Sequence, residues 1–184
     1  MNKTNNVISV WISGVTASGK TTLATHLYDF LKNHKIKDLV LLDGDILRNS
    51  LNKSFGYSPE ERLKAIKEYV EIVKIENQKG KNVIISTVAH KLKSRIYARN
   101  HIQNFYEINL SCNPDICKKR DYKNIYSSLS KDECLPGITE PFEINNNAEL
   151  IIDTGKNSLE VCKSIIQNNV IGLFHNMYDL QKNS

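Results

Sequence analysis

No apolar run in the sequence approaches the length of about 20 residues that a transmembrane helix needs. The N-terminal stretch MNKTNNVISVWIS likewise lacks the long apolar segment of a secretory signal. These absences argue against a membrane-spanning or secreted protein. We therefore expect a cytoplasmic protein without a membrane partner.

Cysteine is also scarce, with four copies in 184 residues. Cys112, Cys117, Cys134 and Cys162 form no Cys-x-x-Cys pair, and no group of Cys and His residues has zinc-finger spacing. We therefore expect reduced thiols that mostly fill apolar space. The only tryptophan, Trp11, lies inside an apolar run and is expected in the core.

A large excess of one charge is missing as well. The formal net charge is +5, which suits an anionic ligand but is too small to predict nucleic-acid binding. A polynucleotide kinase would present a basic groove with interleaved aromatic side chains, and the most basic stretch, 91–99, contains only Tyr97. We therefore expect no nucleic-acid partner.

The sequence does contain a regular alternation of apolar runs and helical patterns. Helices are predicted at 21–32 and 58–79, with a C-terminal helix at about 158–180. Buried strands are predicted at Val7–Ser13, Leu39–Leu42, Val83–Thr87 and Leu150–Asp153, with Phe105–Leu110 as a fifth. Strands that alternate with helices imply a parallel sheet with helices on both faces.

The helix predicted at 58–79 carries recognisable signals at both ends. Ser58 can cap its N-terminus, Pro59 suits the first turn, and Glu61 completes a capping box. Gly80 can end the helix. These signals predict a long helix with defined ends.

The segment 121–147 differs from the rest of the chain. It is polar, contains Pro136, Gly137 and Pro141, and has little periodicity. A long excursion of this kind in a compact domain is usually a working loop or lid. We therefore expect one domain over 1–184, with a lid at about 121–147.

The stretch Gly14 to Thr21, GVTASGKT, matches the pattern G-x-x-x-x-G-K-[ST]. Glycines let the backbone curl tightly and direct its N–H groups at phosphate oxygens. Lys20 reaches the β- and γ-phosphates, and Thr21 offers its hydroxyl to Mg²⁺. A chance glycine-rich turn is the alternative, but the required strand before and helix after are both present.

This motif predicts a three-layer P-loop NTPase fold of the nucleotide-kinase type, with a five-stranded parallel sheet and a lid. ATP and Mg²⁺ are the expected cofactors, and Thr21 is the expected metal ligand. The residues predicted to bind ATP in the loop are Gly14, Thr16, Ala17, Ser18, Gly19, Lys20, Thr21 and Thr22.

Two carboxylates end the second predicted strand, in LLDGDILRNSL. Because ligands bind at the carboxyl ends of strands in open α/β sheets, an acid there can accept a proton from an attacking hydroxyl or orient it. We predict that Asp45 and Lys20 are catalytic and that Asp43 lies in the substrate site. Alternatively, Asp43 is a turn residue and Asp45 caps the next helix. Arg48 suits a phosphate or sulfate of the substrate, or is a surface charge.

The region after the third predicted strand is basic. Lys91, Lys93, Arg95 and Arg99 are expected mostly on a solvated helix face, with guidance of anionic substrates as the alternative. His90 could contact substrate because it follows a strand end, or it could be solvated or cap a helix.

Five segments occur in the order and spacing of adenylylsulfate kinases, and the chain resembles this family over roughly Val7 to Ile166. These segments are GVTASGKTT, LLDGDILRNSLNKSFGYSPEER, CKKRDYKNIY, PGITEPFE and LIIDT. The combination of DGDxxR with GYSPEER is much more specific than the P-loop alone. The resemblance implies transfer of the γ-phosphate of ATP to the ribose 3′-hydroxyl of an anionic nucleotide. It also implies a homodimer.

The same resemblance implies roles for individual residues. Asp45 would activate the hydroxyl, and Arg48 and Arg62 would bind the anionic end of the substrate. Tyr57 would stack on its base. Residues assigned to the lid are Lys123, Leu135 and Ile138, on the substrate side, and Arg120, near ATP.

Three departures from the family pattern fall around the acceptor nucleotide. Val88–Lys91 reads VAHK where the family has Ile-Ser-Pro followed by arginine, Ala65 replaces an asparagine, and Leu135 replaces a phenylalanine that stacks on adenine. The last two changes would each weaken adenine recognition by about 1–3 kcal/mol. The P-loop and the DGDxxR core are intact.

These departures predict that the reaction is kept and that the acceptor differs. One relative of the family phosphorylates cytidine diphosphoramidate on the route to phosphoramidate-decorated capsule polysaccharides, and this is the favoured acceptor. The alternatives are a genuine adenylylsulfate kinase, which makes 3′-phosphoadenylylsulfate in sulfate assimilation, and another P-loop small-molecule kinase. A non-catalytic nucleotide switch would be expected to lose Lys20 or Asp45, and both are present.

Overall fold

Five strands form one sheet, in which every neighbouring pair is parallel. Their order across the sheet is β2-β3-β1-β4-β5. The strands are β1 (Ser9–Gly14), β2 (Leu39–Asp43), β3 (Asn82–Thr87), β4 (Phe105–Ser111) and β5 (Leu150–Asp153). The predicted five-stranded parallel sheet is confirmed.

The structure is a computed structural model that describes residues 7–51, 55–56, 58–121, 136–137 and 139–182. Several residues singled out from the sequence lie outside these ranges: Tyr57, Lys123, Cys134, Leu135 and Ile138. Their assigned roles therefore stay predictions.

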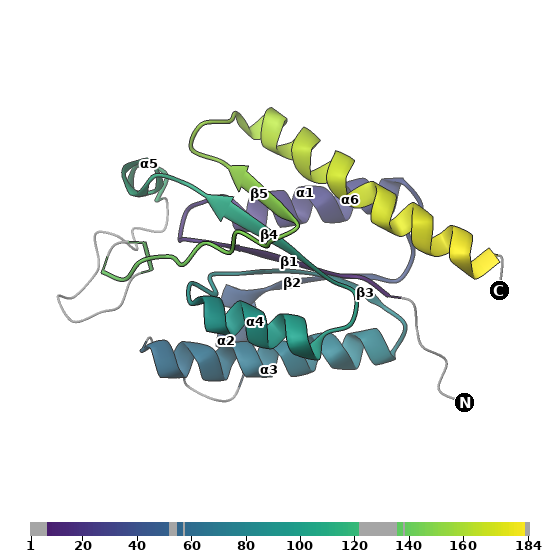
Figure 1. Cartoon of the computed structure of the whole chain (residues 1–184), viewed down its shortest axis with the longest axis horizontal. Helices are drawn as coiled ribbons and strands as arrows, with labels where there is room; N and C mark the ends of the chain where they lie inside the picture. The colour runs from purple at the N-terminus through teal and green to yellow at the C-terminus, as the bar shows by residue number, and fades with distance from the viewer. Residues whose placement is uncertain (1–6, 52–54, 57, 122–135, 138, 183–184) are drawn as a thin grey trace.

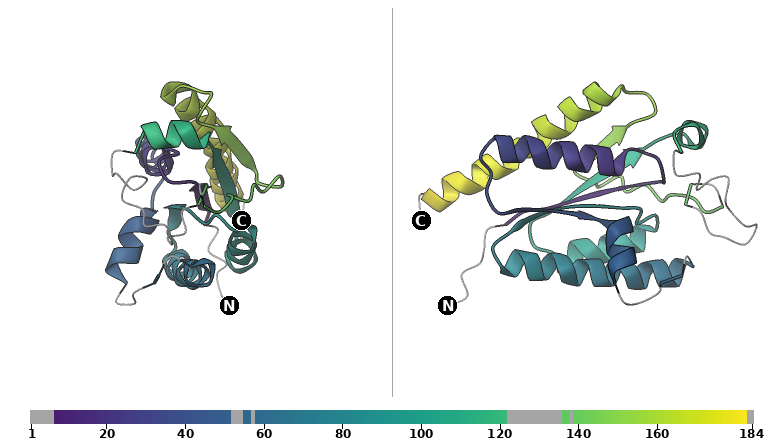
Figure 2. Two further views of the ribbon diagram at one scale, coloured as in Figure 1. Left: turned by 90° about the vertical axis from the view of Figure 1, so that its left-hand side faces the viewer. Right: turned by 180° about the vertical axis from the view of Figure 1, so that it is seen from behind.

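Helices cover both faces of the sheet (Figure 1). On one face lie α1 (Lys20–Asn33) and α6 (Leu159–Lys182), and on the other lie α3 (Pro59–Gln78) and α4 (Leu92–His101). Figure 2 shows the same layers from the side and from behind. The short helices α2 (Gly44–Ser50) and α5 (Pro114–Lys119) follow β2 and β4. Among the described residues, no helix combines the length and apolar character of a bilayer span.

Alternating side chains of the strands divide the core into two apolar clusters. Val10 and Ile12 of β1 pack with α1 and α6, whereas Trp11 packs with α3 and α4. Trp11 is fully buried, as predicted. The described cysteines are free thiols, and burial raises the pKa of Cys117 to about 12, which keeps it protonated and unreactive.

Both ends of α3 follow the sequence signals. The Ser58 hydroxyl accepts a hydrogen bond from the Glu61 N–H at 3.3 Å, and Pro59 opens the helix. Gly80 follows the C-cap with a φ of 80°, a conformation that glycine adopts without a steric penalty. The predicted N-cap and C-terminal stop are confirmed.

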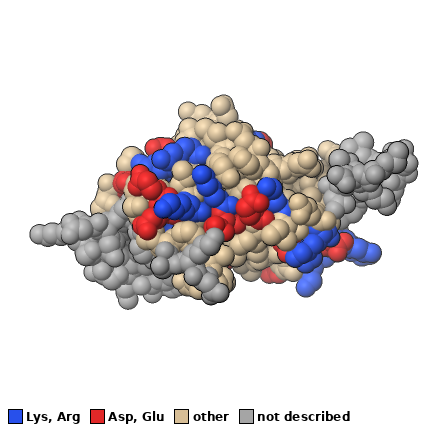
Figure 3. Space-filling model, turned by 90° about the horizontal axis from the view of Figure 1, so that it is seen from below, with Lys and Arg blue, Asp and Glu red and all other residues tan. Residues whose placement is uncertain are grey.

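Charges of both signs are interleaved on the side of the molecule that carries α3 and α4 (Figure 3). On α3, Lys74 pairs with Glu71 at 2.9 Å and Lys79 pairs with Glu76 at 2.6 Å. These two lysines are therefore paired with acids three residues earlier in the chain.

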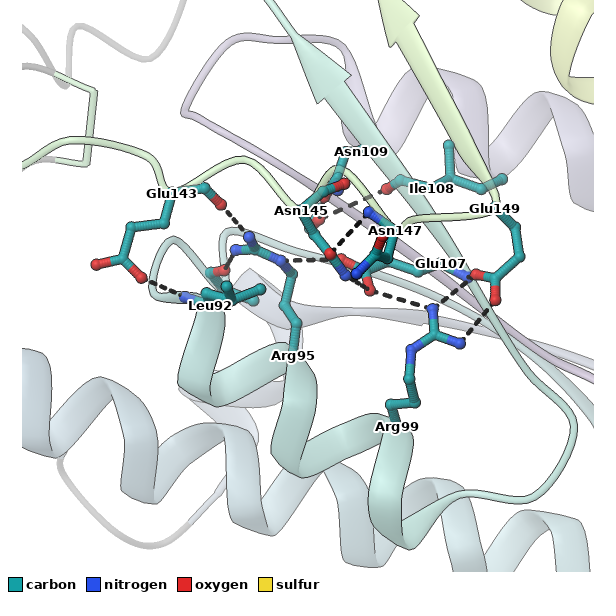
Figure 4. A network of polar contacts seen from close by, with 12 residues as sticks. Leu92, Arg95, Arg99, Glu107, Ile108, Asn109, Glu143, Asn145, Asn147 and Glu149 are labelled. Atoms are coloured by element: carbon teal, nitrogen blue, oxygen red, sulfur yellow. Dashed lines mark hydrogen bonds and ion pairs between the residues drawn. The ribbon is translucent and has the colours of Figure 1, made fainter.

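The interpretation of the basic run as a solvated face is wrong for Arg95. Its side chain is fully buried and donates from Nε to Oε1 of the equally buried Glu107 at 2.9 Å. Arg99 is 33% exposed and holds both carboxylate oxygens of Glu149. Figure 4 shows the resulting network between α4, β4 and the segment 143–149. The charge is tolerated inside because a carboxylate on the neighbouring strand meets it.

Candidate active site

A cavity of about 800 Å³ opens where the strands end. Its walls come from the loop after β1, the ends of β2 and β3, and the residues that follow β5. β1 lies between β3 and β4 in the sheet. The connection from β1 leads to β2 on one side of it, and the connection from β3 leads to β4 on the other side, so the strand order reverses here. Ligands of open α/β sheets bind in the crevice at such a point.

The predicted phosphate loop forms the tight turn between β1 and α1. Ala17 and Gly19 have φ angles of 60° and 91°, which curl the backbone. A Cβ atom on Gly14 would lie 2.6 Å from Ser18 Oγ and 2.9 Å from the Leu110 carbonyl oxygen, so only glycine fits there. The positive N-terminal end of α1 opens on the cavity, as an anion site requires.

Asp43 connects the phosphate loop to the second strand. Its Oδ2 accepts hydrogen bonds from Thr21 Oγ1 at 2.8 Å and Ser86 Oγ at 3.1 Å. Its Oδ1 accepts from the N–H groups of Asp45 and Ile46. Asp43, rather than Asp45, therefore caps α2, because its side chain reaches the free N–H groups of the first turn.

The Asp43 carboxyl is charged at neutral pH. Burial raises its pKa, but the hydrogen bonds from Thr21, Asp45 and Ser86 outweigh burial and leave the pKa below its ordinary value. A carboxylate beside a hydroxyl is an oxygen donor set of the kind that Mg²⁺ prefers. Thr21 and Asp43 thus fit the predicted metal.

We expect Asp43→Asn to raise the Mg²⁺ concentration that ATP binding needs by about tenfold or more, because changing a residue that is hydrogen-bonded to a metal ligand usually lowers metal affinity by about 10–100-fold. Asparagine caps helices as well as aspartate does, so thermal stability should stay close to that of the wild type. Titration calorimetry of ATP at several Mg²⁺ concentrations measures the effect, with the exposed Asp29→Asn on α1 as the control. An unchanged Mg²⁺ dependence would remove Asp43 from the metal site.

Asp45, Arg48 and Arg62 gather around Tyr69. The buried Tyr69 hydroxyl donates to the Gly44 carbonyl at 3.0 Å. Burial raises the pKa of Tyr69, Arg48 and Arg62 oppose this rise, and the charge of Asp45 adds to it. All three charged side chains also line the cavity, so an acid and two cations converge on the space beside the phosphate loop.

Arg48 has a second contact that the sequence did not suggest. Its Nη1 donates to the carbonyl oxygens of Phe55 and Gly56, at 2.8 and 3.0 Å. It therefore holds the segment that leads into α3, and the interpretation as a mere surface charge is wrong. The same segment leads to Tyr57, which is outside the described residues.

Arg120 caps the C-terminus of α5 and reaches the wall behind the phosphate loop. Its Nη2 donates to the Thr154 carbonyl at 3.0 Å, and Thr154 Oγ1 donates to the Ser18 carbonyl at 3.0 Å. Thr154 and Asn157 line the cavity as well. Neither residue was predicted from the sequence. Thr154 could have been, because it directly follows a predicted strand and ligands bind at the carboxyl ends of strands in such sheets.

Most predicted site residues of the described chain line this one cavity. They are Thr16, Ala17, Ser18, Gly19, Lys20, Thr21, Thr22, Asp43, Asp45, Arg48, Arg62 and Arg120. Gly14 acts instead through close packing beneath the loop. The Lys20 ammonium donates to the Val15 carbonyl at 2.7 Å, so it lies across the loop.

His90 lies in the cavity wall, buried to 2% exposure, and its Nε2 is 2.8 Å from Glu140 Oε2. The interpretations of His90 as a solvated or helix-capping residue are wrong, because Lys91 is the N-cap of α4. Lys91 also contacts Glu140, at 2.9 Å. Glu140 went unnoticed in the sequence because its segment has no periodicity.

A phosphate loop, an acid-capped helix beside it and two arginines facing the same cavity define a P-loop kinase for small molecules. The family model described as adenylylsulphate kinase matches residues 6–153. The chain belongs to the adenylylsulfate kinase family, and it is an enzyme that transfers phosphate to a hydroxyl group. ATP and Mg²⁺ are its cofactors.

Two curated relatives illustrate the match. A probable adenylyl-sulfate kinase of Archaeoglobus fulgidus is 36% identical over 150 residues, which cover 80% of this chain and 96% of that protein. A probable adenylyl-sulfate kinase of Bacillus subtilis is 31% identical over 159 residues, which cover 84% of this chain and 80% of that protein.

Solved structures agree on the fold. The Mycobacterium tuberculosis APS kinase CysC, in complex with AMPPNP and APS, has a TM-score of 0.77 at 24% identity and covers 87% of this chain and 95% of its own. A gluconokinase from Sinorhizobium meliloti has a TM-score of 0.61 at 14% identity, with 96% and 97% covered. At these identities the likeness establishes the fold alone.

Proposed function

We propose that the protein transfers the γ-phosphate of ATP to the ribose 3′-hydroxyl of a nucleotide that carries a further anionic group. The observation that carries this proposal is that the phosphate loop, Asp45, Arg48 and Arg62 line a single cavity of about 800 Å³. This volume lies within the range of about 300–1,000 Å³ that pockets for small molecules span.

Each part of the site has a role in this reaction. The acceptor oxygen bonds to the γ-phosphorus, the bond from that phosphorus to the β-phosphate oxygen breaks, and ADP leaves. Asp45 takes the hydroxyl proton, and the Lys20 ammonium stabilises charge on the phosphates. Bound Mg²⁺ would neutralise charge on the β- and γ-phosphates. The hydrogen bond between Thr21 and Asp43 fixes Asp43 beside the phosphate loop. Asp45 follows two residues later in the chain and is therefore also close to the loop.

The acceptor we propose first is cytidine diphosphoramidate, for the capsule polysaccharide phosphoramidate route. The departures from the family pattern support it. Val88, Ala89 and His90 line the cavity in place of the family's Ile-Ser-Pro. Ala65 lies instead in the apolar core beneath α3, 1% exposed, and does not line the cavity. The alternative acceptor is adenylylsulfate, which the names of the curated relatives favour.

We expect kcat/KM to be at least about tenfold higher with cytidine diphosphoramidate than with adenylylsulfate, because tenfold corresponds to about 1.4 kcal/mol, the loss of one hydrogen bond to adenine. Assays with Mg-ATP and each acceptor measure this ratio, and NMR of the product locates the new phosphate. A preference for adenylylsulfate would assign the protein to sulfate assimilation. Phosphorylation of a sugar acid and of neither nucleotide would favour another small-molecule kinase.

The lid at about 121–147, the homodimer and the cytoplasmic location stay predictions. A relative described as a hexameric APS kinase from Thiobacillus denitrificans has a TM-score of 0.65 at 21% identity, and this chain covers 30% of that chain. We propose a dimer for the present protein on the family resemblance. Size-exclusion chromatography with light scattering would test it.

A further inference from the structure

His90 presents one ring nitrogen to Glu140, and among the described residues its other ring nitrogen has no hydrogen-bond partner. Nε2 is 2.8 Å from Glu140 Oε2. Hydrogen bonds from Lys91 and His90 lower the pKa of Glu140 to about 2, so this carboxylate is ionised and can only accept. Nε2 must therefore carry a hydrogen and donate it.

The other nitrogen, Nδ1, is not fully enclosed by the protein. In the described part of the chain, the only fully buried side-chain nitrogen or oxygen atoms without a hydrogen bond are Trp11 Nε1 and Ser18 Oγ. His90 Nδ1 has no such bond either, so it is not fully enclosed, and His90 belongs to the cavity wall. A neutral ring with its hydrogen on Nε2 offers a lone pair at Nδ1.

The ring is neutral at neutral pH. Burial lowers the pKa of His90, and this effect exceeds the opposing one of the hydrogen bond to Glu140. The positive charges of Arg62 and Lys91 act in the same direction as burial. The lone pair at Nδ1 is therefore available to a ligand.

The loop that carries His90 is held in place from both sides. The His90 carbonyl accepts from the Glu143 N–H at 3.0 Å. The Leu92 N–H donates to Glu143 Oε2 at 2.6 Å. Arg95 donates to the carbonyl oxygen of Ala89 and to that of Glu143 (Figure 4). The imidazole is thus aligned before substrate arrives, which favours selective binding.

We propose that His90 selects the acceptor, with Nδ1 accepting a hydrogen bond from an N–H group of the acceptor nucleotide. This inference rests on the proposed function and deepens it. Sulfate oxygens and ionised phosphate oxygens have no hydrogen to give, so the lone pair repels them. Two N–H groups could fit: the exocyclic amine of the base, and a nitrogen bound to phosphorus at the anionic end. A binding site generally rejects a ligand that leaves one of its polar groups unpaired or that is repelled by it.

The test is His90→Gln in the full-length protein, with His90→Asn as the matched variant. The glutamine amide can keep the donor to Glu140 but has no acceptor atom where Nδ1 stood, whereas the asparagine oxygen lies near that place. We expect His90→Gln to raise the acceptor KM by roughly tenfold, with the KM for ATP unchanged and His90→Asn closer to the wild type.

Matched acceptors identify the source of the N–H group. With cytidine diphosphoramidate as reference, CDP lacks the nitrogen on phosphorus and uridine diphosphoramidate lacks the exocyclic amine. If adenylylsulfate is the better acceptor, its inosine analogue lacks the amine. The effect of His90→Gln should vanish with the one analogue that lacks the bonded group. An equal effect with all acceptors, or none with any, overturns the inference while leaving the proposed function standing.

A second measurement does not depend on the variants folding. Long-range ¹⁵N NMR of histidine-labelled wild type should show His90 as the Nε2–H tautomer, with the Nδ1 resonance shifting when acceptor binds. A hydrogen on Nδ1, or no shift at saturating acceptor, overturns the inference. A wild type that phosphorylates no nucleotide overturns the proposed function, and this inference with it.

Discussion

Asp45→Asn is expected to lower kcat by about 10²–10⁴-fold, the usual contribution of a general base. Asparagine has the same shape but cannot take the hydroxyl proton. The cap of α2 is Asp43, not Asp45, so the helix that carries the site should keep its stability. The affinity for ATP should change little, because the phosphate loop and Thr21 are untouched.

Steady-state kinetics and calorimetry separate these effects. A residue that acts only in the transition state lowers kcat and kcat/KM by the same factor, and ATP affinity measured by calorimetry reports on the phosphate loop. The exposed Asp29→Asn is the matched control. A loss of less than tenfold with full ATP binding would show that another group accepts the proton.

Arg95→Met is expected to destabilise the protein by about 3–5 kcal/mol, the usual cost of removing one partner from a buried ion pair. Glu107 is fully buried and would keep its charge, with a hydrogen bond from Asn145 and, among the described cations, the more distant Arg99 as its remaining ion-pair partner. The carbonyl oxygens of Ala89 and Glu143 would also lose their donor. Urea unfolding gives the change in the free energy of unfolding.

Two further variants identify the cause. Arg99→Met removes a similar side chain that is 33% exposed, and we expect a cost of about 0–1 kcal/mol, as for surface pairs. Adding Glu107→Gln to Arg95→Met should recover part of the lost stability, since no charge is left unpaired. If Arg95→Met costs no more than Arg99→Met, the buried pair does not stabilise the fold.

If His90 contacts the acceptor as proposed, the Arg95 network connects stability with acceptor binding. Arg95 donates to the carbonyl oxygens of Ala89, beside His90, and of Glu143, so it joins the cavity wall to the C-terminal part of the predicted lid segment. A packing defect there would loosen the part of the cavity wall that contains His90 while leaving the phosphate loop intact. Variants of this network should therefore raise the acceptor KM more than the KM for ATP.

Local sequence was enough to establish the fold class and half of the site. The strand, glycine turn and helix around Lys20 form a contiguous motif whose geometry depends on neighbouring residues. Asp43 and Asp45 were placed at the ligand-binding edge by a general property of parallel sheets. The capping role of Asp43 was assigned to the wrong aspartate, because either acid can occupy an N-cap and only the observed end of β2 distinguishes them.

The polar pairs in and behind the cavity wall, by contrast, could be identified only from the tertiary structure. Glu140 contacts His90, which lies 50 residues away in the sequence. Arg95 of α4 is buried because Glu107, on strand β4, pairs with it. The periodicity of the sequence predicts which apolar side chains are buried, because the burial of each one is favourable without a specific partner. A charged side chain is buried only where a partner meets it, and that meeting exists only once distant segments have packed together.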